Sequence, residues 1–251
     1  MKWLVLLEVK KCDFDNLSNL LRSSDEFSLI TENSKYYLTS SRWESLTNES
    51  AVYGEATKGL KHISAVARIQ FTDFPLLKPD IICEVDEEGK LHRRVAGSAT
   101  IMLPPASFSI QLEGGQDIIH NLEFESWMKL AEEDEIVKNV FRQITDFEHN
   151  WINLYKVYEI VNKDPGKKKI EQWTKDKIRQ FKHTANSQSA IGDDARHGVD
   201  QNDRPKEPMS LSEADALIMT LLQKWLQWKC EQQKYNSKLR HRLRNESLDK
   251  E

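Results

Sequence analysis

The spacing of apolar residues over the first 112 positions is typical of short β-strands separated by polar turns. One pair of apolar runs flanks the polar stretch 32–35 and a second pair flanks the acidic turn 86–90, so two hairpins are expected. Gly89 occupies the position in the second turn that favours a left-handed backbone. The predicted strands are residues 3–9, 27–30, 36–38, 81–85, 91–95, 100–103 and 108–112.

Two segments of this region show helical spacing instead. Residues 13–21 place Phe14 and Leu17 on one face, with Asp13 as the expected N-cap, and residues 49–69 carry a longer apolar stripe. His62 and His92 are expected to be isolated surface residues. We therefore predict an α+β protein that begins with a small, mostly antiparallel sheet domain over residues 1–115.

The apolar period changes to 3.6 residues beyond position 117, which predicts a helical bundle over residues 116–251. Asp-Pro-Gly at 164–166 is expected to end one helix, another is expected over 170–181, and Ser-Leu-Ser-Glu at 210–213 is a capping box that begins the last. Ile136 and Leu211 are expected on buried helix faces. An aromatic-rich buried face is predicted for Phe147, Trp151, Leu154, Tyr155, Tyr158 and Val161.

Composition narrows the function classes only slightly. The net charge of −4 and the pI of about 6.0 argue against a protein that coats nucleic acid over its whole surface, but they allow a local basic face. Cys12, Cys83 and Cys230 lie far apart without metal-ligand spacing, which favours a reducing compartment. The apolar start of the chain ends at Glu8, so we expect a first strand rather than a signal peptide, no membrane span and a cytoplasmic location.

The most distinctive segment is a long polar loop predicted over residues 183–209, between helical segments. Three interpretations are open: Asp194 pairs with Arg196 and merely orders the loop, Arg196 holds a phosphate oxygen while His183 or His197 transfers a proton, or the loop is disordered. No metal site is expected, because the two histidines have no recognised ligand spacing. No phosphate loop or dinucleotide fingerprint is present in the sequence, so no cofactor is expected.

The aromatic helix supplies the expected contact for this loop. Its aromatic side chains are more often core than ligand platform, but Glu159 lies one turn beyond Tyr155, and a buried Glu159 needs a partner such as Arg196. The expected binding residues are Tyr155, Glu159, Asn186, Asp194 and Arg196. The expected catalytic residues, if the protein is an enzyme, are His183, Arg196 and His197.

Two resemblances are carried by these residues. The run 151–159 (WINLYKVYE), followed by Asn186, Ala195-Arg196-His197 and Met-Ser-Leu at 209–211, resembles a family of uncharacterised bacterial proteins over most of the chain and implies no activity. The bundle with its Leu-Tyr-Lys…Glu helix also resembles, more loosely, the HEPN ribonuclease domains of bacterial defence and toxin systems, which carry Arg, four to six residues and then His. Here that spacing runs from Arg142 to His149, upstream of the aromatic helix.

The end of the chain, from residue 229, holds few apolar residues and a basic cluster at 238–244. It is interpreted either as a solvated helix extension or as an electrostatic contact to RNA or an acidic protein through Arg240, Arg242 and Arg244.

The function expected from these patterns is that of an accessory or binding protein, with the Arg-His loop binding a ligand or partner. The two resemblances imply that it is a bacterial protein, of a defence or stress system. The alternative is a HEPN-like ribonuclease that needs no metal.

Overall fold

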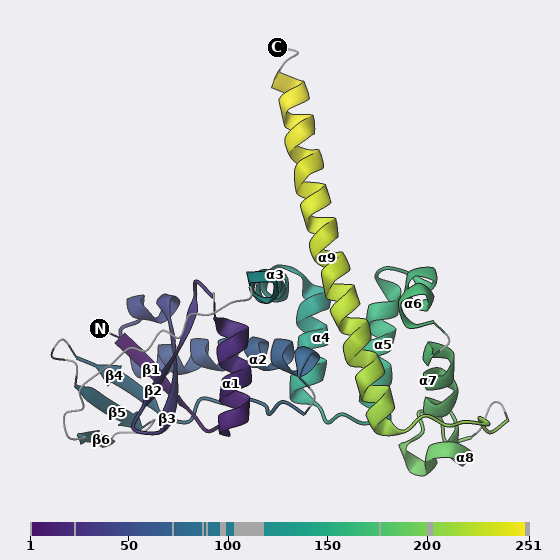
Figure 1. Cartoon of the computed structure of the whole chain (residues 1–251), viewed down its shortest axis with the longest axis horizontal. Helices are drawn as coiled ribbons and strands as arrows, with labels where there is room; N and C mark the ends of the chain where they lie inside the picture. The colour runs from purple at the N-terminus through teal and green to yellow at the C-terminus, as the bar shows by residue number, and fades with distance from the viewer. Residues whose placement is uncertain are drawn as a thin grey trace. The chain divides into compact units, whose positions relative to one another are not determined.

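The computed structural model describes residues 2–22, 24–71, 73–86, 88, 90–95, 99–102, 118–175, 177–199 and 203–248. The chain divides into two compact units, Met1–Met128 and Lys129–Glu251, here called unit 1 and unit 2 (Figure 1). Strands, two α-helices and the 3-10 helix η1 (Ser41–Ser45) are the regular elements of the described part of unit 1 before residue 103, and helices dominate from residue 118 onward. The predicted α+β class is therefore confirmed.

Unit 1 contains one antiparallel sheet, which within the described residues has six strands in the order β2-β3-β1-β4-β5-β6. Every neighbouring pair is antiparallel, as the hairpin pattern predicted. The strand predicted at 108–112 lies outside the described residues. The strands are β1 (Lys2–Leu7), β2 (Phe27–Glu32), β3 (Lys35–Ser40), β4 (Ile82–Val85), β5 (Leu91–Val95) and β6 (Ala99–Met102).

Both predicted hairpins form, and local chemistry closes their turns. Asn33 and Ser34 both have positive φ, 49° and 62°, the pattern of a two-residue turn whose twist matches the flanking strands. In the second turn one Asp86 carboxylate oxygen accepts from the amides of Glu88 and Lys90. The other oxygen lies 2.7 Å from His92 Nε2, and this hydrogen bond, with that from the Lys90 amide, lowers the pKa of Asp86. The prediction that His92 is an isolated surface residue is therefore wrong, because its ring binds Asp86. Gly89 lies outside the described residues.

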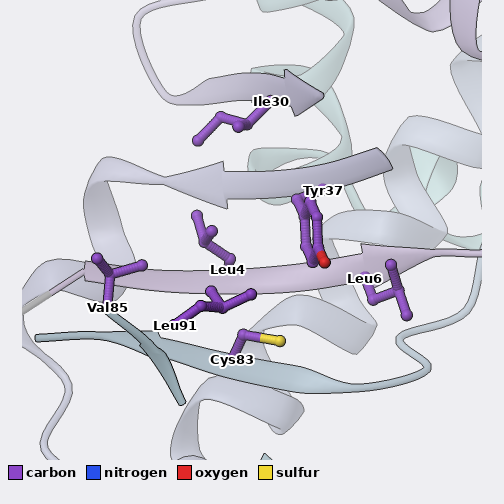
Figure 2. Packing of buried hydrophobic residues seen from close by; sticks show 7 residues of the cluster. All are labelled: Leu4, Leu6, Ile30, Tyr37, Cys83, Val85 and Leu91. Atoms are coloured by element: carbon purple, nitrogen blue, oxygen red, sulfur yellow. The ribbon is translucent and has the colours of Figure 1, made fainter. Parts of the chain in front are cut away.

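One face of this sheet carries a continuous apolar cluster. Strand pairing places Leu6 opposite Tyr37 and Leu4 opposite Cys83, so these side chains project to the same side. Figure 2 shows them gathered on that face. The cluster consists of Leu4, Leu6, Ile30, Tyr37, Cys83, Val85 and Leu91.

The opposite face is covered by α1 (Lys11–Leu21) and α2 (Glu49–Gln70). Phe14 on α1 stacks on Tyr36 at 4.0 Å between ring centroids, and Gly59 on α2 lies against the ring of Phe27, which a Cβ at position 59 would approach to 3.2 Å. The expected N-cap at Asp13 is wrong, because α1 begins two residues earlier. Asp13 instead lies in the first turn, where its negative charge favours the helix dipole.

Unit 2 and the start of α3, which precedes it, are helical, as the change in hydrophobic period predicted. The elements are α3 (Ile118–Glu133), α4 (Glu135–Asp146), α5 (Trp151–Lys163), α6 (Lys167–Thr174), α7 (Lys177–Ala185), α8 (Gln188–Ile191), the 3-10 helix η2 (Gly192–Asp194) and α9 (Leu211–Leu248). The capping box is confirmed, since the Ser210 amide and hydroxyl both donate to Glu213 and the Glu213 amide donates to the Ser210 hydroxyl.

Four sequence expectations about this region need correction. The single helix expected over 170–181 is two helices, because the chain turns at Lys175, which has a positive φ of 50°. The polar loop expected over 183–209 begins as the end of α7 and contains α8 and η2. Ile136 and Leu211 are more than a third exposed, because Ile136 is the second residue of α4 and Leu211 the first residue of α9. Phe147 follows α4 and is exposed rather than part of the aromatic face of α5.

A charged cluster ties three helices of unit 2 together. Lys229 of α9 lies 2.7 Å from an Asp134 oxygen and 2.8 Å from an Asp164 oxygen, and the Trp225 indole also donates to Asp164. Asp134 caps α4, accepting from the amides of Ile136 and Val137, and Asp164 follows α5. The solvated extension therefore begins beyond residue 229 rather than at it, because Lys229 is buried by its two partners.

Electrostatics make this cluster stabilising at neutral pH. Burial raises the pKa of Asp134, but the hydrogen bonds from Lys229 and the Val137 amide outweigh it and leave that pKa lowered. Burial lowers the pKa of Lys229, but its bonds to Asp134 and Asp164 leave that pKa raised. The folded unit thus favours both charged forms, and this contribution to stability is lost in acid, as the pH falls through the lowered pKa of Asp134.

No helix among the described residues is long and apolar enough to cross a membrane. Cys12, Cys83 and Cys230 are not disulfide-bonded.

The Lys229 cluster gives the first testable prediction. Lys229→Met should lower the free energy of unfolding of unit 2 by about 3 kcal/mol, because it leaves two shielded carboxylates without their counter-charge. Hydrogen–deuterium exchange of α9 amides near Trp225 measures this for unit 2 alone. Lys167→Met is the matched control: its pair with Glu171 is exposed, so a change below about 0.5 kcal/mol is expected. Equal effects of the two variants would contradict the structural role of Lys229.

Candidate functional site

The site is built on the aromatic face of α5, which packs on α7. Phe181 of α7 stacks on Trp151 and Tyr155 at 6.1 and 5.8 Å and meets Tyr158 edge-on at 6.0 Å. Burial, with the nearby Tyr155, raises the pKa of Tyr158, so its phenol stays neutral. These rings form core, and their packing fixes α7 against α5.

Arg196 lies on this aromatic base, as the sequence predicted. Its backbone amide donates to the Ala185 carbonyl at 2.9 Å. Its guanidinium carbon lies 4.5 Å from the centre of the Tyr155 ring, and Nη2 donates to Glu159 Oε1 at 2.8 Å. Three contacts of different kinds therefore hold one arginine in a defined position.

The ion pair with Glu159 is largely open to solvent. The Arg196 side chain is 35% exposed and the Glu159 side chain 42% exposed. Glu159 is therefore not buried, since the position lies at the edge of the aromatic face, but it pairs with Arg196 as anticipated. The expected latch from Asp194 to Arg196 is also not observed: Asp194 is exposed in η2, and the guanidinium turns to Glu159 instead. An exposed pair of this kind contributes only about 0–1 kcal/mol.

Asn186 connects the end of α7 to the same base. Its Nδ2 donates to the Lys182 carbonyl at 2.7 Å and lies 3.5 Å from the Tyr155 hydroxyl. Its Oδ1 is shielded from solvent and accepts no hydrogen bond from a described residue. Tyr155, Glu159, Asn186 and Arg196 thus converge, whereas Asp194 does not join them.

A polar face of α7 holds the returning segment 203–209. His183 Nε2 bonds the Asp203 carbonyl at 2.7 Å, the Gln180 amide donates to the Glu207 carbonyl, and the Thr184 hydroxyl accepts from the Met209 amide. A carbonyl only accepts, so this bond requires the proton on Nε2 of His183. The sequence interpretation missed Gln180 and Thr184, although their spacing with His183 places all three on one helix face.

His197 follows Arg196 and is half-buried. Its imidazole has no hydrogen bond or ion pair with another residue in the described part of the chain. Of the two loop histidines, His183 is therefore occupied in holding the backbone and His197 is available for chemistry.

Other candidate residues do not join the site. Arg142 binds Asn139 on its own helix, whereas His149 pairs with Asp215 of α9 and bonds the Ile144 carbonyl, so the Arg142-to-His149 spacing has structural roles at both ends. Residues 240, 242 and 244 lie on the helical backbone of α9, but their side chains lie outside the described part of the structure.

The residues that could act as metal ligands also lie apart from one another. Searched over the described residues, no group of three or more His, Cys, Asp or Glu side chains is placed to hold a metal ion. Asp200, a candidate ligand by sequence, lies outside the described residues. The chemistry that the site itself offers is that of an oriented guanidinium beside an imidazole, which suits recognition of phosphate or carboxylate oxygens.

The Arg196 contacts give the second prediction. Arg196→Ala should increase amide hydrogen exchange across residues 192–199, because it removes the stacking and the ion pair that order this segment. The free energy of unfolding should fall by only about 1 kcal/mol, because an exposed ion pair contributes little to stability. Arg204→Ala, which changes an exposed arginine of the returning segment 203–209, is the control and should leave exchange at 192–199 unchanged. Unchanged exchange in the Arg196 variant would show that the contacts of Arg196 with Tyr155 and Glu159 do not order this segment.

No protein-family model, no curated protein and no solved structure matches this chain.

Proposed function

We propose that this protein is a binding protein whose unit 2 takes an anionic ligand at Arg196 and His197. The observation that carries the proposal is the oriented guanidinium. Its backbone bond to Ala185 and its stacking on Tyr155 do not involve Glu159, so the side chain stays positioned when the carboxylate leaves. Of its five N–H donors, one binds Glu159, and no other described residue accepts from the rest.

A phosphate group is the ligand chemistry that this arrangement fits best. A guanidinium presents paired donors that match two oxygens of one phosphate. Glu159 stands in for such an anion in the unliganded protein, and because its ion pair is exposed, displacing it costs little. We further propose that the protein acts as an accessory protein of defence or stress in a bacterial cytoplasm, which rests only on the resemblances of its sequence to uncharacterised bacterial proteins and to defence-system domains.

The third prediction tests this proposal with AMP as the probe. At about ten times its dissociation constant, a ligand stabilises its protein by about 1.4 kcal/mol, so AMP should raise the melting temperature whereas adenosine, which lacks the phosphate, should not. Arg196→Gln should abolish the shift, and Glu159→Gln should enlarge it by removing the competing carboxylate. Arg204→Gln is the matched control and should behave like the original protein. A shift that survives Arg196→Gln would overturn the proposal.

A second candidate is a ribonuclease that needs no metal, and the free imidazole of His197 beside Arg196 favours it. In such a reaction His197 would act as general acid or base while Arg196 stabilises charge on the phosphate. The bond from His183 to Asp203 gives His183 a supporting role in holding the segment.

The fourth prediction separates the ribonuclease from the binding protein. If the protein cuts RNA, it should do so in excess chelator, and the double change His183→Ala with His197→Ala should abolish cleavage. His197→Ala alone should remove most of the activity, whereas His62→Ala in unit 1 should not. Induced expression should slow growth, and His197→Ala should relieve it. Cleavage that needs a metal and survives the double change would refute this candidate.

A further inference from the structure

The helices α6 and α7 carry a concentration of positive charge that the sequence interpretation did not single out. Between positions 163 and 182 the chain has eight Lys or Arg and three Asp or Glu, a net charge of +5 in a protein whose total is −4. The two helices contact each other and both contact α5 and α9 of the same unit (Figure 1). We call this the α6–α7 cationic surface: Lys167, Lys168, Lys175, Lys177, Arg179 and Lys182.

Most of these charged side chains do not contribute to the buried core of unit 2. The buried positions of the two helices are apolar residues and threonines, such as Ile170, Thr174 and Phe181. Within the described residues, Lys168, Lys175 and Lys182 form no ion pair, unlike the buried Lys229. Lys168 and Lys175 are exposed, and Lys182 is half-buried.

Helix stability does not explain the lysines either. The first turn of α6 contains no acidic residue and begins with Lys167 and Lys168. Cations at a helix N-terminus oppose the helix dipole, at a cost of about 0.3–1 kcal/mol each. Residues that destabilise their own helix and make no compensating contact in the fold are candidates for a functional role.

The surface is continuous with the Arg196 site. Arg179 and Lys182 on α7 and Asn186 directly after it are spaced by three and four residues, so they follow one another along one side of the helix and its C-terminal end over about 10 Å. Asn186 bonds Tyr155, and Arg196 stacks on that ring. A polyanion lying along this face would reach the guanidinium.

We propose that the α6–α7 cationic surface binds the phosphate backbone of a single-stranded nucleic acid that extends to Arg196. This rests on the proposed function and names its ligand class. A protein partner fits less well, because protein interfaces centre on apolar anchors. None of the large exposed apolar side chains in the described residues lies on α6 or α7. A single strand fits better than a duplex, because unstacked bases can lie on the exposed face of a guanidinium.

The fifth prediction uses a fluorescent oligouridylate of about 20 nucleotides, with anisotropy measured from about 50 to 200 mM KCl, the range over which phosphate contacts dominate the salt dependence. The triple variant Lys168→Gln, Lys175→Gln and Lys182→Gln should weaken binding. It should also reduce the slope of log K against log salt by about 2, since each single-strand phosphate contact contributes about 0.7. The matched control neutralises three exposed lysines of unit 1, Lys11→Gln, Lys35→Gln and Lys78→Gln, and should bind as the original protein does.

The outcomes separate this inference from the proposed function. If the triple variant binds normally while Arg196→Gln loses AMP, the inference is overturned and the proposed function stands. If the original protein binds AMP but not oligouridylate, the inference is likewise overturned and the proposed function stands. Duplex DNA of equal length bound as tightly as the oligouridylate, or tighter binding of polyglutamate, would also overturn it. If Arg196→Gln loses AMP binding but still binds oligouridylate normally, only the proposed extension of the nucleic acid to Arg196 is overturned.

Discussion

The packing of Phe181 against Trp151, Tyr155 and Tyr158 is the interaction on which the candidate site depends. It fixes α7 on α5, and α7 then places the Ala185 carbonyl where the Arg196 amide binds it. The same ring packing leaves the outer side of Tyr155 for the guanidinium. An apolar contact between two helices thereby positions a charged side chain that is distant in sequence.

The charges of unit 2 fall into two groups with different consequences. Lys229 is shielded between Asp134 and Asp164, where removing one partner would leave a buried charge uncompensated, so it contributes to folding. Arg196, Lys168, Lys175 and Lys182 are at least partly exposed, so they add little stability and remain open to an anionic ligand. The distinction comes from burial and partners rather than from residue type.

Unit 1 is organised differently. Its sheet pairs apolar side chains across neighbouring strands, and its turns are closed by local chemistry, as with Asp86, whose carboxylate binds two backbone amides and His92. A cavity of about 350 Å³ near the end of β1 is lined in part by Glu8, Lys78 and Asp80. The guanidinium and imidazole of the candidate site belong to unit 2, so the functional proposals rest on that unit.

The sequence by itself determined the elements whose causes are local. Alternation and turn residues specified the hairpins of unit 1, the Ser210–Glu213 capping box specified the start of α9, and the position of Glu159 one turn beyond Tyr155 indicated a partner for Arg196. Tertiary structure decided what depends on burial and on contacts across the chain. It placed Glu159 at a solvent-open edge, engaged His183 with the Asp203 carbonyl, and buried Lys229 between two distant aspartates. A residue's spacing fixes the side of the helix on which it lies, but only the packed neighbours determine whether water, a backbone carbonyl or a counter-charge meets it there.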